Sequence, residues 1–265
     1  MRRVITLTTD FGLDDPFVGI MKGVILSIAP DAEVVDITHG IRPQDVAQAA
    51  YAIKSAYAYF PKKTVHVAVV DPGVGGARRP MAAEYDGRRF VGPDNGIFSG
   101  ILGPRARAYE LARPKYFLKT VSGAFHGRDI FAPVAAWIAR GTALSKLGPR
   151  ITDPRVLDLP KPSFDGNQLK GQIVYIDRFG NLVSNIDSDW MDRCFSGPGN
   201  LTVMAGKKKI GPILTSYSQA RRGQCGGIVN SWGHLEIFCR EDSAAKCLGY
   251  GISETVAVSR ERAKP

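Results

Sequence analysis

The sequence has few cysteines and no long apolar segment. Its 265 residues include four cysteines, all in the last third of the chain, with no C-x-x-C pair and no histidine at ligand spacing. This pattern argues against a zinc site and predicts free thiols in a reducing compartment. No run of about 18 apolar residues occurs, so we expect no transmembrane helix. The start, MRRVITLTTDFG, lacks the apolar core of a signal peptide, and we expect a cytoplasmic protein without membrane contact.

The chain also lacks the pattern of a nucleic-acid-binding surface. Its net charge of +10 permits binding to polyanions, but the basic residues are scattered and are not interleaved with aromatic residues. Solubility is the simpler explanation of the charge, and nucleic acid is an unlikely partner. The apolar fraction of 44% is ordinary for a globular protein with a substantial core.

The first 140 residues alternate between strand-like and helix-like segments. We expect strands at 4–9, 33–37 and 64–70, helices at 17–29, 44–59 and 129–139, and a hairpin around Asp86-Gly87. Asp14-Asp15-Pro16 predicts a helix start with a carboxylate cap and proline at the first helical position. The alternation predicts an α/β domain with a mainly parallel sheet covered by helices.

The helical period mostly disappears after a proline-rich stretch at 141–165, which we interpret as a linker. The remaining chain reads as short strands, at 168–176, 182–186, 201–204, 227–230, 235–238 and 255–259. Short strands separated by turns predict a smaller all-β, barrel-like domain. We therefore predict an α/β domain at 1–155 and an all-β domain at 166–265.

The stretch VDPGVGGARRP, Val70–Pro80, is the strongest candidate site. It follows a predicted buried strand, and ligands of open α/β sheets bind just outside the carboxyl ends of strands. Asp71 stands at that end, with Arg78 and Arg79 nearby, although a glycine-rich turn with a surface salt bridge explains them equally well. Asp10 ends the first strand and suits the ribose hydroxyls of a nucleoside, or a structural cap.

Four further motifs combine polar or aromatic residues with turn formers. They are PDNG with Asp94 and Asn95, FHGRD with Phe125 and His126, IDRFGN with Asp177, Phe179 and Asn181, and NSWG with Ser231. Each also has a plain structural reading as a tight turn, a helix start or a lone structural histidine.

Taken in order, these motifs make the chain resemble the S-adenosyl-L-methionine (SAM) hydroxide adenosyltransferase family. This family is related to the SAM-dependent fluorinase and chlorinase. The resemblance runs through TTDFGLDDPFVGIMKG, VDPGVG, PDNG, FHGRDIFAP, IDRFGN and NSWG. It implies an α/β domain followed by a barrel-like domain. It also implies a homotrimer with active sites between the N-terminal domain of one subunit and the C-terminal domain of its neighbour. SAM is the implied substrate, with no cofactor and no metal.

The resemblance also assigns roles to residues. Asp71, Arg78 and His126 would hold and activate water, with Arg79 as an alternative to Arg78 if the alignment contains a gap. Asp10 would bind the ribose hydroxyls, and the other candidate substrate-binding residues are Asp94, Asn95, Phe125, Asp177, Phe179, Asn181 and Ser231.

The halogenating relatives carry tyrosine in place of the aspartate and lack the histidine. Asp71 and His126 therefore favour hydroxide, as does Gln44, where the halogenases share a tryptophan. The expected reaction is attack of an activated water on C5′ of the ribose, giving adenosine and L-methionine. At the position of the run FCRED, relatives usually show a small, Asn-containing stretch. The resemblance therefore does not assign contacts beyond Ser231. The alternatives are a halogenase, a basic nucleic-acid-binding protein with an OB-like barrel, and a SAM or adenosine sensor without turnover.

Overall fold

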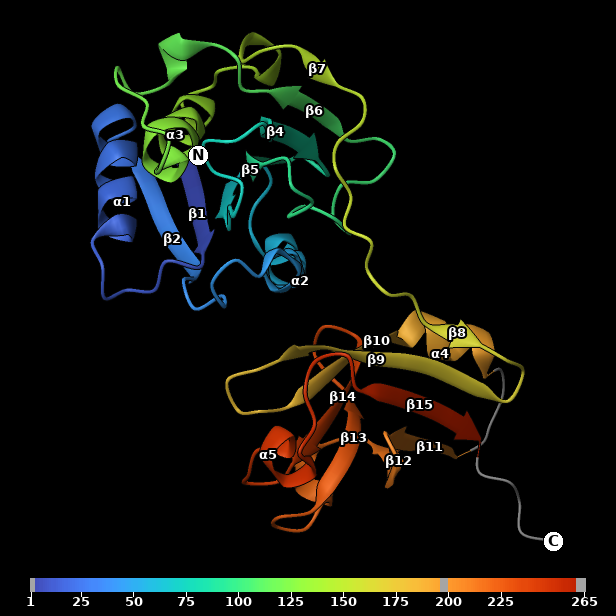
Figure 1. Cartoon of the computed structure of the whole chain (residues 1–265). Coiled ribbons are helices and arrows are strands. Elements are labelled where there is room, and N and C mark those ends of the chain that lie inside the picture. The colour runs from blue at the N-terminus through green and yellow to red at the C-terminus, as the bar shows by residue number, and fades with distance from the viewer. Residues whose placement is uncertain (1–2, 196–199, 261–265) are drawn as a thin grey trace, which may run out of the picture. The chain divides into compact units, whose positions relative to one another are not determined.

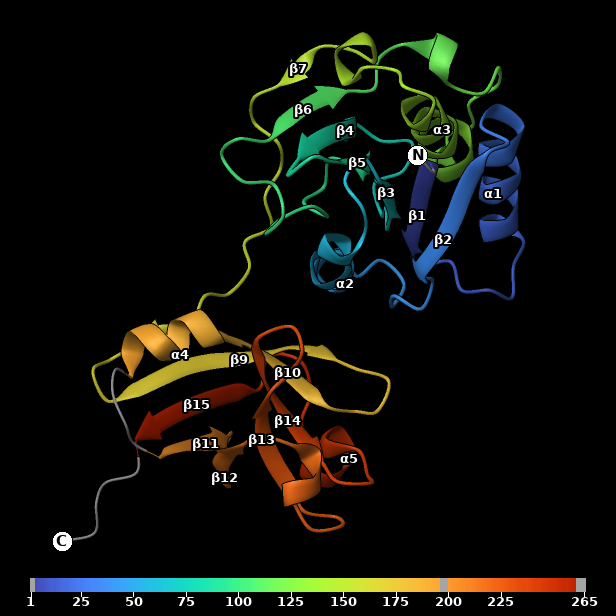
Figure 2. The ribbon, with the colours of Figure 1, turned by 180° about the vertical axis from the view of Figure 1, so that it is seen from behind.

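The computed structural model describes residues 3–195 and 200–260. The chain divides into two compact units, Met1–Asp158 and Leu159–Pro265 (Figures 1 and 2). Each unit has its own sheet and its own hydrophobic core.

The N-terminal unit is built on a seven-stranded sheet with the order β2-β1-β3-β5-β4-β6-β7. The strands β2, β1, β3 and β5 are parallel, and β4, β6 and β7 extend the sheet with antiparallel pairings. Its strands are β1 (Arg3–Thr9), β2 (Ala32–Thr38), β3 (Val65–Val69), β4 (Pro80–Tyr85), β5 (Arg88–Pro93), β6 (Arg107–Glu110) and β7 (Arg150–Ile151). Its helices are α1 (Phe17–Ile28), α2 (Val46–Ala56) and α3 (Ala132–Ala139), with single turns η1 (Tyr57–Tyr59), η2 (Pro114–Tyr116) and η4 (Leu144–Lys146), and π-helical η3 (Gly127–Phe131).

The central strands are buried on both faces. In β3, Val65, Val67 and Val69 belong to the core under α1 and α3, whereas Ala68, together with Val70 just after the strand, belongs to the core under α2. Helices α1 and α3 lie side by side in Figures 1 and 2. The sequence predicted this α/β architecture correctly, because strands buried on both faces form continuous apolar runs.

The predicted helix begins at Phe17 as expected, but the predicted carboxylate cap and the placing of Pro16 at the first helical position are wrong. Pro16 occupies the N-cap position of α1, no side chain caps the helix, and Asp14 and Asp15 are exposed. The apolar face of α1, with Met21 and Ile25 fully buried, fixes the helix without a cap.

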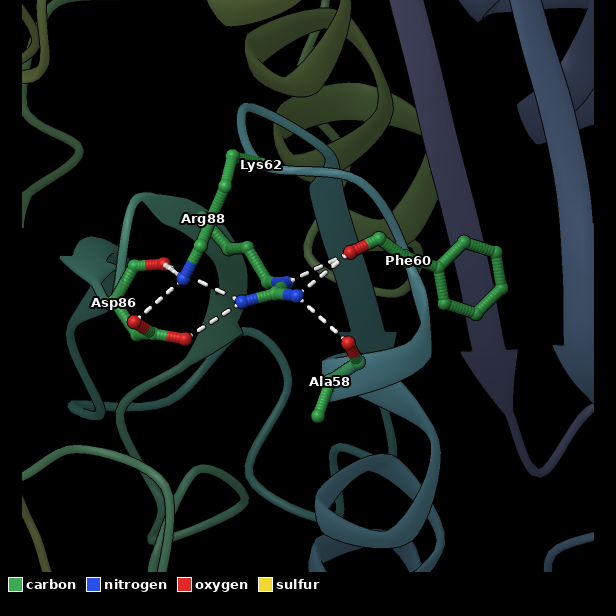
Figure 3. Close-up of polar contacts among 5 residues, drawn as sticks. All are labelled: Ala58, Phe60, Lys62, Asp86 and Arg88. Atoms are coloured by element: carbon green, nitrogen blue, oxygen red, sulfur yellow. Dashed lines mark hydrogen bonds and ion pairs between the residues drawn. The ribbon is translucent and has the colours of Figure 1, made fainter.

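The β4–β5 hairpin turns at Asp86 and Gly87, which both have positive φ, as a type I′ turn requires. Behind the turn, the buried guanidinium of Arg88 donates to the carbonyls of Ala58 and Phe60 and to the carboxylate of Asp86 (Figure 3). These bonds fasten the hairpin to the chain segment that leads into β3.

The C-terminal unit is a closed seven-stranded barrel. Its order is β10-β14-β13-β12-β11-β15-β9, and a β10–β9 pairing closes it, while the short β8 adds to β9. The strands are β8 (Ser163–Phe164), β9 (Gln168–Ile176), β10 (Leu182–Asp187), β11 (Leu201–Ala205), β12 (Lys208–Leu214), β13 (Cys225–Val229), β14 (His234–Cys239) and β15 (Thr255–Arg260). Helices α4 (Ser188–Cys194) and α5 (Ala244–Leu248) and the turn η5 (Tyr217–Gln219) complete the unit. The predicted barrel is confirmed, and β12, which the sequence analysis did not identify, begins with lysines and contains a positive-φ glycine.

The proline-rich stretch 141–165 divides between the two units. Its first part carries η4 and β7, and β7 pairs with β6 at the edge of the N-terminal sheet. The division falls between Asp158 and Leu159. Across the described residues, no helix has the length and apolar character needed to cross a bilayer.

His66 makes the stability of the N-terminal unit depend on pH. It is fully buried in β3, bonds Thr6 through Nδ1 at 2.8 Å and stacks on Phe90. Burial, reinforced by the nearby charge of Arg88, lowers the pKa of His66 to about 3. A folded-state pKa below the unfolded value means that stability falls as pH drops from about 6.5 to about 3.

We therefore expect the unfolding free energy in urea to decrease between pH 6.5 and pH 4, with His66 contributing up to about 1.4 kcal/mol per pH unit. His66→Asn, which keeps a polar atom near the Nδ1 position, removes this contribution and flattens the curve. His234→Asn, the same exchange in the barrel, is the control. Equal slopes for His66→Asn and the unmodified protein would show that His66 does not carry the effect.

Candidate functional site

The parallel strands bring three aspartates to one edge of the N-terminal sheet. Asp10 follows β1, Asp71 follows β3 and Asp94 follows β5, and these strands are neighbours in the sheet. The carboxyl ends of parallel strands share an edge, so residues 84 positions apart in sequence are gathered there (94 − 10).

Asp71, Arg78 and His126 form a connected cluster at this edge. Arg78 donates to both carboxylate oxygens of Asp71, from Nε at 3.0 Å and from Nη2 at 2.5 Å. The same Nη2 lies 2.6 Å from Nδ1 of His126. The side chains of Arg78 and Asp71 are only 6% and 5% exposed, so water screens the pair weakly. The guanidinium also lies over the Phe131 ring, 5.4 Å from its centroid.

The contact with Arg78 determines the protonation state of His126. A guanidinium can only donate, so Nδ1 of His126 must accept and the proton of the neutral ring resides on Nε2. Burial, followed by the positive charge of Arg78, lowers the pKa of His126 below its ordinary value, even though Asp71 and Asp129 oppose the shift. His126 is therefore a neutral ring that can donate from Nε2.

Arg78 and Arg79 are adjacent in the sequence but bind different carboxylates. Arg79 donates from Nε to Asp94 at 2.9 Å and from Nη1 to Asp153 at 2.9 Å. Of these two arginines, only Arg78 binds Asp71.

Two features bring the loop that carries His126 against the loop that carries Asp71. Gly75 has φ +74°, and a Cβ built there would lie 2.2 Å from the carbonyl oxygen of Gly123. Asp129, fully buried at the base of the second loop, accepts bonds from the backbone N–H and the hydroxyl of Ser122 and from Arg128. Only glycine at position 75 permits this approach of the two backbones.

A cavity of about 420 Å³ opens beside the cluster within the N-terminal unit. Asp71 and His126 line it, and Asp10 and Gln44 lie on its wall. Asp10 accepts a bond from the backbone N–H of Gln44 at 2.8 Å, and Gln44 has a positive φ of 67°. This bond holds the loop that follows β2 at the rim of the cavity.

Three phenylalanines form an apolar wall of the same cavity. Phe125 packs edge-on against Phe11 and Phe17, with ring centroids 5.7 and 5.3 Å apart. The sequence analysis singled out Phe125 but not Phe11 or Phe17, although both lie within the TTDFGLDDPF motif. Both residues lie just before or at the start of a predicted helix, and this position did not indicate that their rings would line a cavity.

The structure does not bring Asp94 and Asn95 to the cavity. Both oxygens of Asp94 are engaged, by Arg79 and by the backbone N–H of Arg155. Asn95 donates to the carbonyl of Val70 at 2.8 Å, directly before Asp71. In this unit Asp94 and Asn95 support the loops around the site and do not line it.

In the barrel, the predicted residues form two turns. Asp177 accepts from the backbone N–H groups of Phe179 and Asn181 and from the Asn181 amide, which closes the β9–β10 hairpin. Phe179 is 78% exposed, and Ser231 is exposed in the β13–β14 turn. Asp177 and Asn181 thus have a structural function that leaves Phe179 presented to solvent.

An α/β unit with an acid, a guanidinium and an imidazole beside a strand-end cavity, followed by a closed barrel, defines a two-domain small-molecule-binding protein. Residues 5–148 match the sequence model of the SAM hydroxide adenosyltransferase N-terminal domain, and residues 171–257 match that of its C-terminal domain. The chain belongs to the SAM hydroxide adenosyltransferase family.

Individual relatives agree with this membership. The chain is 36% identical to an (R)-S-adenosyl-L-methionine hydrolase of Thermus thermophilus over 93% of its length and 96% of the relative's. It is 41% identical to a hydrolase of the same name from Salinispora tropica, over 96% and 97%. A fluorinase of an Actinoplanes species is 30% identical over 88% and 90%. A crystal structure of an uncharacterised Thermotoga maritima protein superposes with a TM-score of 0.88 at 32% identity, covering 97% of this chain and all of that one.

We expect Gly75→Ala to lower activity at least tenfold, because the new Cβ must push the Gly123 backbone, and with it His126, away from Asp71. The measurement is steady-state turnover of SAM. Gly123→Ala is the matched control, since a Cβ at that position meets nothing within 4 Å. Unchanged turnover in Gly75→Ala would show that the contact does not position the cluster.

Proposed function

We propose that the protein hydrolyses SAM to adenosine and L-methionine by attack of water on C5′ of the ribose. The observation that carries this proposal is the cluster of Asp71, Arg78 and His126, of which Asp71 and His126 line a cavity large enough for part of a nucleoside. The hydrolase names of relatives that match nearly the whole chain support the same reaction.

The charge of the cavity suits a sulfonium substrate. Among the described residues, its lining includes Asp10 and Asp71 and no lysine or arginine, and its aromatic wall can pack against the adenosyl group. Attack on C5′ releases a neutral thioether, so positive charge disappears as the new bond forms. A site that excludes water weakens the hydration of the reactants and favours such a step.

The orientation of His126 divides the work between two groups. Nε2–H can donate to the oxygen of a bound water, while the carboxylate of Asp71 accepts one of that water's protons. Arg78 holds the carboxylate of Asp71 in a fixed orientation beside the cavity, where it can accept from the water. The water oxygen bonds C5′, the electrons of the C5′–S bond pass to sulfur, and the proton leaves through Asp71 to solvent.

Halide transfer is the competing reaction, because fluorinases are also relatives at lower identity. A halide anion entering the cavity would meet the carboxylates of Asp10 and Asp71, and among the described residues only Asp71 is paired with an arginine. Like-charge repulsion in a poorly hydrated site opposes its binding. Water is the nucleophile that this arrangement favours.

The barrel residues enter the proposal through the oligomer. We retain the prediction of a homotrimer in which Phe179, Ser231 and the Asp177–Asn181 turn complete the site of a neighbouring subunit. The exposure of Phe179, at 78%, supports a role in contact with a ligand or partner. Native mass spectrometry tests the assembly, and a monomer that retains full activity would contradict it.

The first test is chromatography of SAM incubated with the purified protein, using both sulfonium epimers, with and without fluoride or chloride. We expect adenosine and methionine in a 1:1 ratio. Asp71→Asn, which removes the proton acceptor at constant shape, should lower kcat by about 10²-fold or more. Asp153→Asn, which alters the exposed partner of Arg79, is the control and should retain activity. A 5′-halogenated nucleoside as the main product would replace hydrolysis with halogenation.

The second test is the pH dependence of kcat/KM. Protonation of His126 would remove the acceptor for Arg78, and its pKa lies below the ordinary 6.5, so activity should persist at pH 6.5 and fall only at lower pH. His126→Gln keeps a donor near the Nε2 position but has no group that titrates in this range. Its residual activity should therefore lack the decrease at low pH that protonation of the imidazole causes. An acid limb centred at or above pH 6.5 would contradict the neutral, Arg78-bonded histidine.

A further inference from the structure

A second cavity, of about 530 Å³, lies at the opposite edge of the N-terminal sheet. It is lined by residues at the amino ends of β1, β5 and β6, by Lys63 just before β3, and by the segment that follows α3. Its volume lies within the range of small-molecule sites. None of the residues assigned to SAM chemistry lines this cavity.

The charged residues of this cavity occupy inward-facing strand positions. Side chains alternate between the two faces of a strand. Arg3 shares the face of buried Ile5, Arg89 that of Val91 and Arg107 that of Tyr109, and these are the positions that pack toward α3. At this edge the apolar pattern of that face gives way to a row of cations.

The positive charge exceeds what the protein itself neutralises. In the part of the chain that the structure describes, Arg3, Lys63, Arg89 and Arg107 line the cavity together with a single carboxylate, Glu84. Glu84 is engaged by Arg107 at 2.9 Å. The carboxylate nearest to Arg3, on exposed Asp31, is 3.8 Å away, and among the described residues no ion pair involves Lys63 or Arg89.

The position of Lys63 is fixed by the hairpin network of Figure 3. Its backbone N–H donates to the carbonyl of Gly87 at 2.7 Å, and the neighbouring Lys62 binds Asp86, which Arg88 also holds. Lys63 adopts φ +69°, a conformation that is costly for a residue with a side chain. A non-glycine residue kept in this conformation at a cavity wall is a recurrent feature of binding sites.

The two cavities of the N-terminal unit therefore differ in sign. Counting described residues only, the cavity beside Asp71 has two carboxylates and no lysine or arginine, whereas this one has four cations and one carboxylate. A concave site lined mainly by one sign of charge concentrates ligands of the other sign.

We propose that this cavity is a binding site for a small, multiply charged phosphate compound, such as a nucleoside di- or triphosphate. Guanidinium groups bind phosphate oxygens in a forked geometry, and three of them with a lysine, less the one charge of Glu84, leave +3 (4 − 1) to match a multiply charged phosphate. The hydroxyls of Thr142 and Ser145 can donate further bonds, and Tyr109 and Leu144 give the cavity an apolar part. A concave cavity on one side of a sheet favours a small molecule over a nucleic-acid strand, for which no aromatic stacking platform accompanies the cations.

The test is isothermal titration of the full-length protein with inorganic triphosphate and with ATP at 50 and 200 mM salt. Inorganic triphosphate has no adenosyl group and so cannot bind through the SAM site. We expect 1:1 binding per chain that weakens with salt and is unaffected by saturating SAM. The double variant Arg3→Gln/Arg89→Gln, which leaves the Arg107–Glu84 pair intact, should weaken binding at least tenfold.

The control is Arg105→Gln/Lys119→Gln, which removes the same charge from exposed positions outside the cavity. It should change the affinity less than twofold. SAM turnover without phosphate ligand checks that the cavity variant is folded, and this readout is independent of triphosphate binding. Equal weakening in both double variants, no binding of either probe at millimolar concentration, or binding of an RNA oligomer but not of triphosphate would overturn the proposal.

Discussion

The guanidinium of Arg78 is the interaction on which the candidate active site depends. It donates to a carboxylate on one side and to an imidazole nitrogen on the other, and both partners come from different loops. Because arginine cannot give up its proton, it fixes the orientation of the Asp71 carboxylate and the tautomer of His126 together. The chemistry proposed for the site follows from that single set of bonds.

The structures around this contact serve to keep it in place. β3 ends in the buried Val69 and delivers Asp71 to the sheet edge, while Gly75 and Asp129 bring the second loop into range. Arg79 anchors the same segment on its other side through Asp94. A water-activating site that relies on hydrogen bonds of fixed geometry needs this support more than it needs additional reactive groups.

Much of the architecture was readable from the sequence, because the strands are short and marked by breakers. β9 was predicted with its observed limits, and β3 to within one residue at each end. β12 was missed because lysines and a Gly-Pro pair conceal its alternation, and the cap of α1 was misassigned because Asp14 and Asp15 look like cap residues.

The site was less fully predictable. Strand-end position identified Asp71, and motif order identified His126, but neither indicates which arginine turns inward. Asp94 lies in a polar turn that looked like part of a binding site, but in the structure its carboxylate pairs with Arg79. These assignments depend on the direction in which each side chain projects from the backbone. In a turn that contains several glycines, the spacing of residues in the sequence does not determine that direction.

The opposite partners of Arg78 and Arg79 constrain how this loop can vary. Gain of one residue between the strand and the arginines would move Arg78 to the outward position that Arg79 now occupies and leave Ala77 at the inward one. In most surface loops insertions are tolerated, but here length itself is part of the chemistry. Chains that share this arrangement should therefore keep the seven-residue interval from Asp71 to Arg78 even where the intervening residues differ.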